Sequence, residues 1–322
     1  MNPLFSVVVP VHNKRPHLER CISSILRQDF SNFEILIVDD ISSDGSAEII
    51  DGFLDVRVRK FKRVVPGPGG YAARNLAIEN SHGQWIAFLD ADDEWLPNHL
   101  SNIKRSIDSH RDARLIATGW INKFPDGGEE VDLYSKIKGQ GQVSQTFDLD
   151  DYIKGPRPIW TGALAIKKDF LDCVGGFNEE WRHGADLELW LRLMLKKSSA
   201  TAIKIFEPTS VYHRDSVNMV TSNLSQYFSP SSVYILEVLQ SGLEGANECT
   251  LRKLSAYANK SAISPFLRHL EKRHIDKKIY AQSFSEKYPT DKYVYLFKVM
   301  EVMPFWLRRI AVKYIRIFMN KR

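Results

Sequence analysis

Short apolar runs recur along the first half of the chain and are separated by stretches with helical spacing. The clearest runs cover residues 5–10, 33–39, 56–61, 85–89 and 115–120. Runs of four to eight mostly aliphatic residues predict strands that are buried on both faces of a sheet.

Between these runs, apolar residues recur every three or four positions. A helix is predicted from Pro16, because Leu18, Cys21, Ile22, Ile25 and Leu26 then share one face. Similar spacing predicts helices over 43–52, 71–81 and 97–110. Strands that alternate with helices predict an α/β fold with a mostly parallel central sheet flanked by helices. Ligands of such sheets bind beyond the carboxyl ends of the strands.

The rest of the chain follows a different pattern. Residues 122–150 are rich in Gly, Asp and Gln and predict a loop or hairpin, followed by a strand over 161–166 and a helix over 184–197. From about Tyr227 onward the pattern is helical and basic, so we divide the chain into a domain of residues 1–225 and a helical C-terminal region of residues 226–322.

The charge is unevenly distributed along the chain. Residues 251–322 contain 17 Lys and Arg against 5 Asp and Glu, a net of +12, so the first 250 residues carry −7 of the overall +5. An acidic body with a basic tail suggests chemistry in the first part and electrostatic docking in the second. Three scattered cysteines, no secretory signal and no apolar run long enough to span a bilayer predict a reduced, cytoplasmic protein.

Three carboxylates, Asp90, Asp92 and Asp93, directly follow the apolar run at 85–89. Like charges this close repel one another unless a cation neutralises them, and oxygen ligands favour Mn²⁺ or Mg²⁺. A metal there would also hold a diphosphate. The alternative is that these acids only stabilise the N-terminus of the helix that follows.

A second acidic pair, Asp39 and Asp40, ends the run at 33–39. Its carboxylates could accept hydrogen bonds from a base or a ribose, or the pair could only form a turn with Ser43 and Gly45. The glycine-rich stretch at 66–70 precedes Arg74 and could let the backbone approach a phosphate.

Taken together, these segments resemble family 2 of the inverting glycosyltransferases, which have the nucleotide-sugar-binding fold called GT-A. The resemblance covers roughly residues 4–220. Its motifs, in the order of the family, are Val7-Val-Val-Pro-Val-His-Asn13, Phe33-Glu-Ile-Leu-Ile-Val-Asp-Asp40 with Ser43-Asp-Gly45, Ala73-Arg-Asn75, Gly83-Gln-Trp-Ile-Ala-Phe-Leu-Asp-Ala-Asp-Asp93 and Val174-Gly-Gly-Phe-Asn178.

The resemblance implies an enzyme that transfers a hexosyl or N-acetylhexosaminyl group from a nucleotide-diphosphate donor, with UDP favoured by analogy, to an acceptor hydroxyl. It implies synthesis of a cell-surface polysaccharide or glycolipid. It also implies donor-binding roles for Pro10, Val11, Asp39, Asp40, Arg74 and Asp90. The Mn²⁺ or Mg²⁺ ligands would be Asp92 and Asp90, with His213 as a third.

The catalytic base of such enzymes lies in an acidic pair that opens an aromatic-rich helix. Here Asp186 matches the second acid, whereas Ala185 replaces the first, and Glu188 is the fallback. Trp160, Arg182 and Trp190 are the acceptor residues that we predict. If the acids are merely solvated, Ala185 favours a nucleotide-sugar or glycan-binding protein without catalysis. The N-terminal run lacks the glycine-rich loop expected of nucleotidyltransferases and dehydrogenases.

The last predicted helix, over residues 303–319, is amphipathic and basic. Trp306, Ile310 and Tyr314 share its apolar side, and Arg309 and Lys313 lie opposite. Such a helix could lie on the anionic inner face of the cell membrane, which would suit a lipid-linked glycan acceptor, or pack on the domain or on a second copy in a homo-oligomer. No nucleic-acid-binding module is recognisable, so nucleic acid is not an expected partner.

Overall fold

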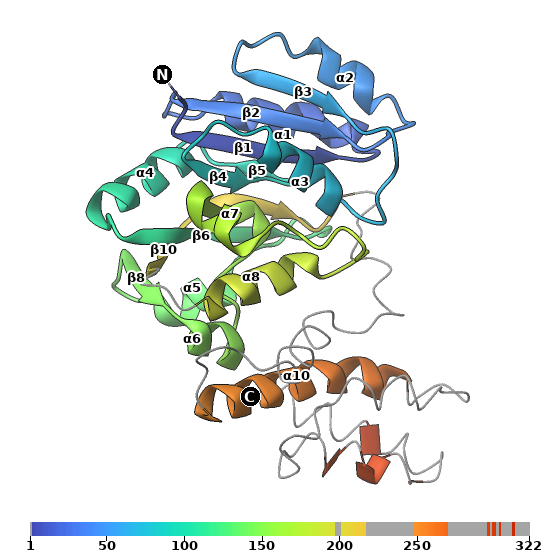
Figure 1. The fold of residues 1–322 in the computed structure, drawn as a ribbon, viewed down its shortest axis with the longest axis vertical. Coiled ribbons are helices and arrows are strands. Elements are labelled where there is room, and N and C mark those ends of the chain that lie inside the picture. Colours follow the sequence, from blue (N-terminus) through green and yellow to red (C-terminus); the bar gives the residue numbers. More distant parts are fainter. Residues whose placement is uncertain are drawn as a thin grey trace. The chain divides into compact units, whose positions relative to one another are not determined.

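The computed structural model describes residues 2–196, 201–216 and 248–269, together with a few positions between 295 and 312. The chain separates into two compact units, Met1–Met219 and Val220–Arg322 (Figure 1). The first unit contains the sheet, all the motifs described above and every predicted site residue. The division of roles between residues 1–225 and 226–322 stays a prediction.

One continuous sheet forms the centre of the first unit. Its strand order is β3-β2-β1-β4-β9-β6-β10-β5, with β7 added beside β6 and β8 beside β10. The first four strands are parallel to one another, β9 is antiparallel to both of its neighbours, and β6 and β10 are again parallel. The strands on the main path are β1 (Phe5–Val11), β2 (Phe33–Asp39), β3 (Val58–Lys62), β4 (Trp85–Phe88), β5 (Glu94–Trp95), β6 (Ala113–Lys123), β9 (Leu164–Lys167) and β10 (Thr201–His213).

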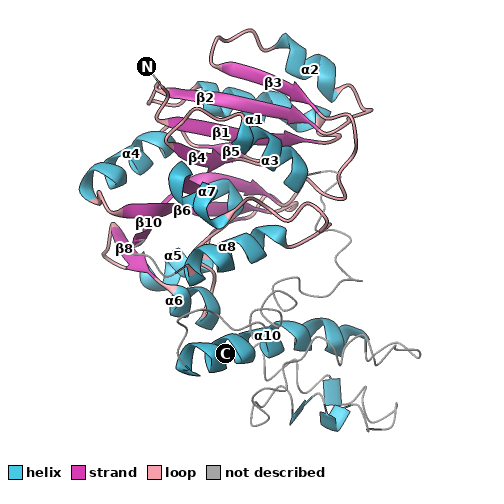
Figure 2. Ribbon diagram, in the orientation of Figure 1, coloured by secondary structure: helices cyan, strands magenta, loops and turns pink. Residues whose placement is uncertain are grey.

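Helices cover both faces of this sheet, as Figure 2 shows. On one face, α1 (Arg15–Leu26) and α4 (His99–Ser109) share a core cluster with alternate residues of β1 and β2, such as Val7 and Ile35. On the other face, α3 (Tyr71–Glu79), α7 (Lys168–Val174) and α8 (Ala185–Leu195) pack where Phe88 contacts Phe177 and Trp190. The short α2 (Ser46–Gly52) follows β2. The α/β fold expected from the alternating pattern is confirmed.

The second half of the sheet differs from the sequence-based expectation. Residues 122–150 are not a simple loop or hairpin, because they contain β7 (Glu129–Val131), α5 (Leu133–Lys138), β8 (Ser144–Phe147) and the start of α6 (Leu149–Lys154). The strand expected over 161–166 begins with a turn of 3₁₀ helix, η1 (Thr161–Ala163), before β9. The long strand β10 was not predicted, because Lys204 and Pro208 interrupt its apolar pattern.

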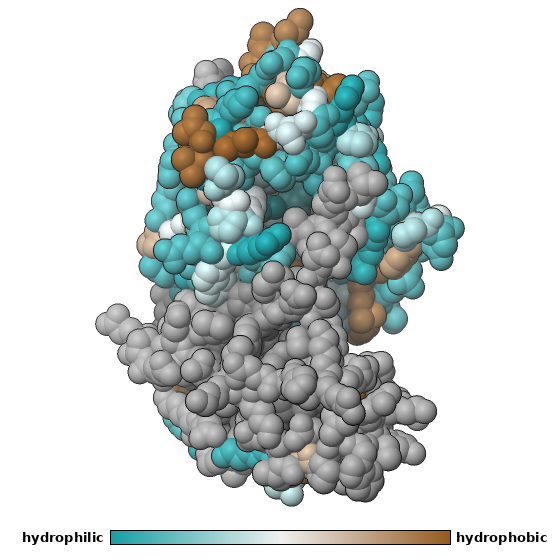
Figure 3. Space-filling view, turned by 90° about the vertical axis from the view of Figure 1, so that its right-hand side faces the viewer, coloured by the Kyte–Doolittle hydropathy of each residue, from teal (hydrophilic) through white to brown (hydrophobic). Residues whose placement is uncertain are grey.

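In the second unit, the structure describes one long helix, α10 (Glu248–His269). The amphipathic stretch at residues 303–319 lies almost entirely outside the described residues. Among the helices that are described, none combines the length and apolar character needed to cross a membrane. In the view of Figure 3 the described surface is mostly hydrophilic, with separate apolar patches. The most exposed large apolar side chains include Leu54, Val56, Val64 and Val65, near β3.

Candidate functional site

The predicted donor residues meet at one edge of the sheet. Strands β2, β1 and β4 are parallel neighbours, and Val11 at the end of β1 pairs with Asp39 at the end of β2. Asp90 follows the end of β4 closely along the chain. Because the carboxyl ends of parallel strands meet at the same edge, the two acidic segments and the Pro10-Val11 segment come together, as the fold rule predicts. We call this place the acid edge, meaning Asp39, Asp40, Asp90, Asp92 and Asp93.

The first acidic pair combines one satisfied and one partly unsatisfied carboxylate. Asp40 forms an ion pair with Arg63, with 2.7 Å between Oδ1 and Nη1, and its amide donates to the carbonyl of Val11 at 2.7 Å. Asp39 accepts a hydrogen bond from the amide of Ser42 through Oδ1. Its Oδ2 is buried and has no hydrogen-bond partner. A buried acceptor without a partner fits a ligand that donates an N–H or O–H group there.

Cations hold the carboxylates of the second acidic segment. Arg74 donates to Asp90 Oδ1, and Lys14 Nζ lies 2.6 Å from Asp92 Oδ2. Arg20 also donates to the backbone carbonyl of Asp92. Both ion pairs are mostly buried, so screening by solvent is weak and each cation offsets the repulsion between neighbouring acids.

Asp93 is the buried member of this segment, with an exposed fraction of 1%. Burial raises the pKa of Asp93 well above its usual range, and the charges of Asp92 and Asp90 add to the effect. The backbone amide of His213 donates to its Oδ1 at 2.8 Å. The imidazole of His213 lies between Glu94 and Asp215, with ring nitrogen to carboxylate distances of 2.9 and 3.2 Å. His213 therefore joins the end of β10 to the acid edge.

The metal expected at this place can be tested against the donor atoms present. Among the described residues, no group of three or more His, Cys, Asp and Glu side chains could hold a metal ion. Asp90 and Asp92 nevertheless offer carboxylate oxygens, and Mg²⁺ typically takes one or two carboxylates together with substrate phosphates and water. The donor set therefore fits a hard divalent ion whose coordination is completed by a diphosphate, and it does not fit an all-protein metal cage.

Asp186, the predicted base, lies in the first turn of α8 and contacts the start of α3. The hydroxyl of Tyr71 donates to Asp186 Oδ1 at 3.2 Å and accepts from the amide of Gly184 at 2.8 Å. Burial, with the charge of Asp186 adding to it, raises the pKa of the Tyr71 hydroxyl. Tyr71 therefore stays a hydrogen-bond donor at neutral pH and fixes the direction of the carboxylate.

Arg74 connects Asp186 to the acid edge. Its guanidinium is buried, and burial alone would lower its pKa, but the charges of Asp90, then Tyr71 and Asp186, raise the pKa overall. Its Nε is buried and has no hydrogen-bond partner. The guanidinium of Arg74 thus lies within electrostatic reach of both Asp90, a predicted metal ligand, and Asp186, the predicted base.

The segments on either side of this arrangement pack closely on one another, although they are far apart in the sequence. The side-chain amide of Asn75 donates to the carbonyl of Phe177 and accepts from its amide, both at 2.9 Å. A Cβ at Gly176 would lie 2.5 Å from Asn75 Oδ1, so only glycine fits there. A Cβ at Gly69 would lie 2.8 Å from the carbonyl of Arg182. The glycine-rich stretch is therefore packed against the loop that leads to Asp186.

The structure corrects two of the predictions around α8. Trp190 is 1% exposed and packs against Phe88 and Phe177, so its side chain belongs to the core and not to an acceptor wall. Glu188 is buried in an ion pair with Arg192, whose guanidinium also donates to the carbonyls of residues 174–176. Most of α8 is buried, so the buried part of the helix includes both residues. Glu188 is therefore not available as the fallback base.

The other two predicted acceptor residues are accessible. Arg182 is exposed in the loop before α8. Trp160 precedes η1 and is partly exposed, with its ring centroid 5.8 Å from that of Trp120 and 4.9 Å from that of Tyr212.

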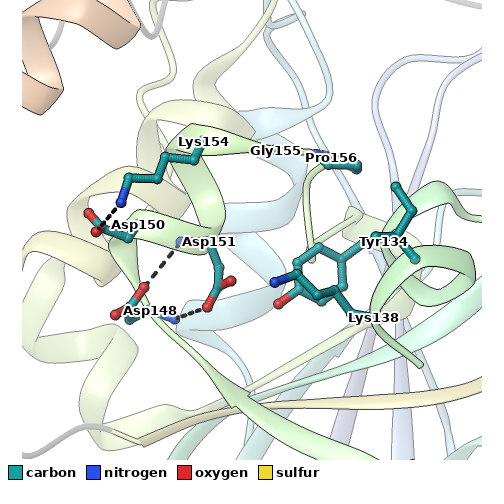
Figure 4. A pocket seen from close by; sticks show the side chains of 9 residues that line it. Tyr134, Lys138, Asp148, Asp150, Asp151, Lys154, Gly155 and Pro156 are labelled. Carbon is teal, nitrogen blue, oxygen red and sulfur yellow. Dashed lines mark hydrogen bonds and ion pairs between the residues drawn. The ribbon is translucent and has the colours of Figure 1, made fainter. Parts of the chain in front are cut away.

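A separate cavity of about 430 Å³ lies between α5 and α6 (Figure 4). Its lining includes Tyr134, Lys138 and Asp151, and none of the predicted site residues. Asp148 and Asp151 hydrogen-bond to each other's backbone amides, and Lys154 forms an ion pair with Asp150. The first two contacts cap the N-terminus of α6 and the ion pair lies along the helix, so these acids have a structural role.

Sequence reasoning missed the residues that neutralise and orient the predicted acids. Lys14, Arg63 and Tyr71 each contact one of them through bonds that span 23 to 115 residues. Each of these residues directly follows a segment that the sequence analysis recognised, and this position was the signal that could have identified it. Lys14 follows the first motif, Arg63 the third strand and Tyr71 the glycine-rich stretch.

Comparisons with known proteins address the family and the fold of the chain. The model of the family described as "Glycosyl transferase family 2" matches residues 6–174, which is 169 of the 322 residues. The chain is 37% identical to the putative teichuronic acid biosynthesis glycosyltransferase TuaG of Bacillus subtilis over 210 residues, covering 62% of this chain and 75% of TuaG. It is 34% identical to glycosyltransferase GlyG of Streptococcus pneumoniae, of which it spans 52%.

A third relative covers more of the chain. The GalNAc(5)-diNAcBac-PP-undecaprenol beta-1,3-glucosyltransferase of Campylobacter jejuni is 27% identical over 81% of this chain and 82% of its own length. Among solved structures, S. aureus TarS 1–349 in complex with UDP-GlcNAc superimposes with a TM-score of 0.70 at 18% identity, over 88% of this chain and 82% of that one. The sequence match and the shared architecture establish that the chain belongs to glycosyl transferase family 2 and is a glycosyltransferase with the GT-A fold.

Proposed function

We propose that this glycosyltransferase moves a sugar from a UDP-sugar to a hydroxyl of a glycan acceptor, with inversion at the anomeric carbon. The acid edge would bind the donor, and Asp186 would act as the catalytic base. The observation that carries the proposal is the position of Arg74, which donates to Asp90 and lies within electrostatic reach of Asp186. A single-displacement transferase needs the donor diphosphate and the acceptor base close together.

The donor nucleoside fits the first acidic pair. Asp39 has a buried oxygen without a partner, which suits a base N–H or a ribose hydroxyl. Asp40 is held in place by Arg63, and Pro10 and Val11 border it at the end of β1. UDP is favoured because TarS, whose structure superimposes on this chain, has been crystallised in complex with UDP and with UDP-GlcNAc.

In the reaction, Asp186 removes the proton from the acceptor hydroxyl while that oxygen attacks the anomeric carbon from the face opposite the diphosphate. The bond from the anomeric carbon to the diphosphate oxygen breaks, and UDP leaves with the bonding electron pair. Tyr71 keeps the Asp186 carboxylate oriented, and the Arg74 guanidinium stabilises negative charge on the diphosphate side.

We also propose that Asp92 and Asp90 hold a Mn²⁺ or Mg²⁺ ion together with the diphosphate, with His213 as a neighbouring group. When bound, such an ion neutralises the charge that develops on the leaving diphosphate. Lys14 and Arg74 already neutralise the two carboxylates, so we expect both cations to lie near the diphosphate as well.

The acceptor is proposed to be a growing cell-surface glycan. The relatives named above for teichuronic acid and for an undecaprenol-linked glycan suggest this class. A lipid-linked acceptor would agree with the basic, amphipathic residues 303–319, which we propose contact an anionic membrane surface. Liposome sedimentation of the full chain against a chain ending at Val302 tests this point, and equal sedimentation of both would reject it.

The proposed function is tested by a donor screen. Full-length protein is incubated with UDP-glucose, UDP-galactose and UDP-GlcNAc, with Mn²⁺ or EDTA, and UDP release is measured with and without a mixed oligosaccharide acceptor pool. We expect metal-dependent UDP release from at least one donor and inverted configuration in the NMR spectrum of the product. In the same assay, Asp186→Asn should lower the turnover. Its matched control is Asp150→Asn, because Asp150 is paired with Lys154 outside the site. No release from any donor, or a retained configuration, would contradict the proposal.

A further inference from the structure

Three aromatic side chains gather beside the acid edge and have no part in the mechanism above. Trp120 lies near the end of β6, Tyr212 near the end of β10, and Trp160 just before η1. The ring of Trp160 lies between the other two, with centroid distances of 5.8 and 4.9 Å and interplanar angles of 43° and 32°. All three rings are partly exposed. We call them the aromatic surface.

The aromatic surface is tied to the acid edge by short connections. Tyr212 is the neighbour of His213, whose amide donates to Asp93. The indole of Trp95 donates to the carbonyl of Gly162 at 2.8 Å, and Trp160 packs so closely on Gly162 that a Cβ there would lie 2.4 Å from its ring. β6 and β10 are parallel, so their carboxyl ends lie at the same edge (Figure 1). A ligand on the aromatic surface would therefore be near the donor.

A buried lysine lies against one of these rings and bonds to the segment that carries a second one. Lys204 is completely buried, and its ammonium donates to the carbonyls of Thr118 and Pro158 at 2.7 and 3.0 Å. It also lies 4.5 Å from the centroid of the Trp120 ring. Pro158 is two residues before Trp160. A buried ammonium is costly unless its partners are fixed, so this one side chain couples the position of Trp120 to that of the segment carrying Trp160.

The chemistry of the aromatic surface matches a sugar ring. A pyranose has an apolar face of C–H groups, which packs on aromatic rings, and a rim of hydroxyls, which needs polar partners. Arg214 supplies such a rim, since its guanidinium lies 5.3 Å from the Tyr212 ring centroid and its Nε donates to Asn122 Oδ1. Trp and Tyr suit such sites because each combines a large apolar face with one hydrogen-bonding group.

We propose that Trp120, Trp160 and Tyr212 form a stacking subsite for a pyranose ring of the acceptor glycan, and that Lys204 is a positioning residue for this subsite. The proposal rests on the proposed function for the direction of transfer. Binding of a glycan to the aromatic surface can nevertheless be measured without any turnover.

The test is saturation-transfer NMR on the full chain with UDP and Mn²⁺ present. The probes are cellotetraose, chitotetraose and laminaritetraose, three tetrasaccharides that differ in linkage and substituents. We expect ring-proton signals from at least one probe, about tenfold weaker affinity in Trp160→Ala, and affinity within threefold of wild type in Trp160→Phe. Tenfold corresponds to about 1.4 kcal/mol, within the range of one aromatic contact.

Two further variants test whether Lys204 positions the aromatic surface or only stabilises the whole fold. Lys204→Met should weaken binding of the same probe severalfold while its UDP affinity, measured by calorimetry, stays within twofold of wild type. Phe53→Ala, which removes a partly exposed aromatic ring after α2, should change neither affinity. The proposal is overturned if no probe binds to wild type, or if Trp160→Ala binds the probe as wild type does. If UDP does not bind but Trp160→Ala still weakens glycan binding, the assignment of the donor site is rejected and the aromatic subsite stands.

Discussion

The acid edge and the aromatic surface lie at the same edge of one sheet, but they are built in opposite ways. At the acid edge, several carboxylates gather in a small space, and Lys14 and Arg74 neutralise two of them, Asp92 and Asp90. At the aromatic surface, three partly exposed rings take the place of the acids, the buried ammonium of Lys204 lies against the Trp120 ring, and Arg214 lies beside Tyr212. The first arrangement suits an anionic diphosphate with a metal, and the second suits an uncharged sugar ring.

The two regions also differ in how regularly the strands that lead to them are paired. The acid edge follows three parallel neighbours, β2, β1 and β4, whose side chains are almost all apolar and buried. The aromatic surface follows β6 and β10, whose pairing contains register shifts between Ile205 and Ser210. Irregular pairing redirects side chains locally. Here it occurs in the strands that lead to the aromatic surface, where the acceptor would bind.

The largest effect is expected at Asp186, which lies within electrostatic reach of Arg74 and so is linked to the acid edge. Replacement by Asn keeps the size of the side chain but removes the proton acceptor, so turnover should fall about 10³-fold, as is typical for loss of a general base. UDP affinity should stay within twofold. UDP-release kinetics and calorimetry check both values, and a turnover within tenfold of wild type would reject Asp186 as the base.

Lys204→Met should have the next largest effect, on folding. Thr118 and Pro158 would lose a donor, and the buried Asp132, whose Oδ1 lies 3.9 Å from Lys204 Nζ, would lose its counter-charge. Loss of one partner of a buried charge pair costs about 3 kcal/mol. Urea unfolding measures this change, with the exposed Lys154→Met as control. A change below about 1 kcal/mol would show that the aromatic surface does not depend on the buried charge.

Lys204 also gives this region a signature in the pH dependence of stability. Burial lowers the pKa of Lys204 from its usual value of 10.5 to about 8. The folded chain therefore loses this proton before the unfolded chain does, so the contribution of Lys204 to stability is fully present above pH 10.5 and is lost as pH falls toward 8. Wild type should gain stability relative to Lys204→Met between pH 8 and pH 10, and parallel curves would contradict this.

His99 should produce a smaller effect in the acid range. It stacks on Trp95, whose indole donates to the carbonyl of Gly162, and burial lowers the pKa of His99 to about 3. Its contribution to stability is full above the unfolded pKa of 6.5 and is lost as pH falls toward 3. Between pH 6.5 and pH 5 wild type should lose about 2 kcal/mol relative to His99→Gln. Urea unfolding at both pH values checks this, with the exposed His82→Gln expected to follow wild type.

The smallest effect concerns the acid edge. Arg63→Met removes the partner of Asp40, so UDP should bind about fivefold more weakly, or about 1 kcal/mol. Arg57→Met removes a comparable ion pair with Asp55, in the loop before β3, and should leave UDP affinity unchanged. Equal calorimetric affinities for both variants would show that Asp40 lies outside the donor pocket.

The two regions also differ in how far the sequence predicts them. The acid edge was predicted because each of its motifs is local, with acids such as Asp40 and Asp90 standing directly after an apolar run. The partners Lys14, Arg63 and Tyr71 were not predicted, since they reach these acids only through pairing of distant segments. Helical spacing alone could not show that Trp190 and Glu188 turn into the core. Trp160 was predicted alone, because nothing local shows that Trp120 and Tyr212 join it.

The proposed donor site depends above all on the acids that follow β4, Asp90 and Asp92, binding the donor diphosphate together with a divalent ion. Calorimetric titration of UDP into the full chain, with Mn²⁺ or with EDTA, tests it most directly when wild type and Asp92→Asn are compared. The account predicts that Mn²⁺ strengthens UDP binding at least about tenfold in wild type and has little effect in Asp92→Asn. The same dependence on Mn²⁺ in both proteins, or none in wild type, would contradict it.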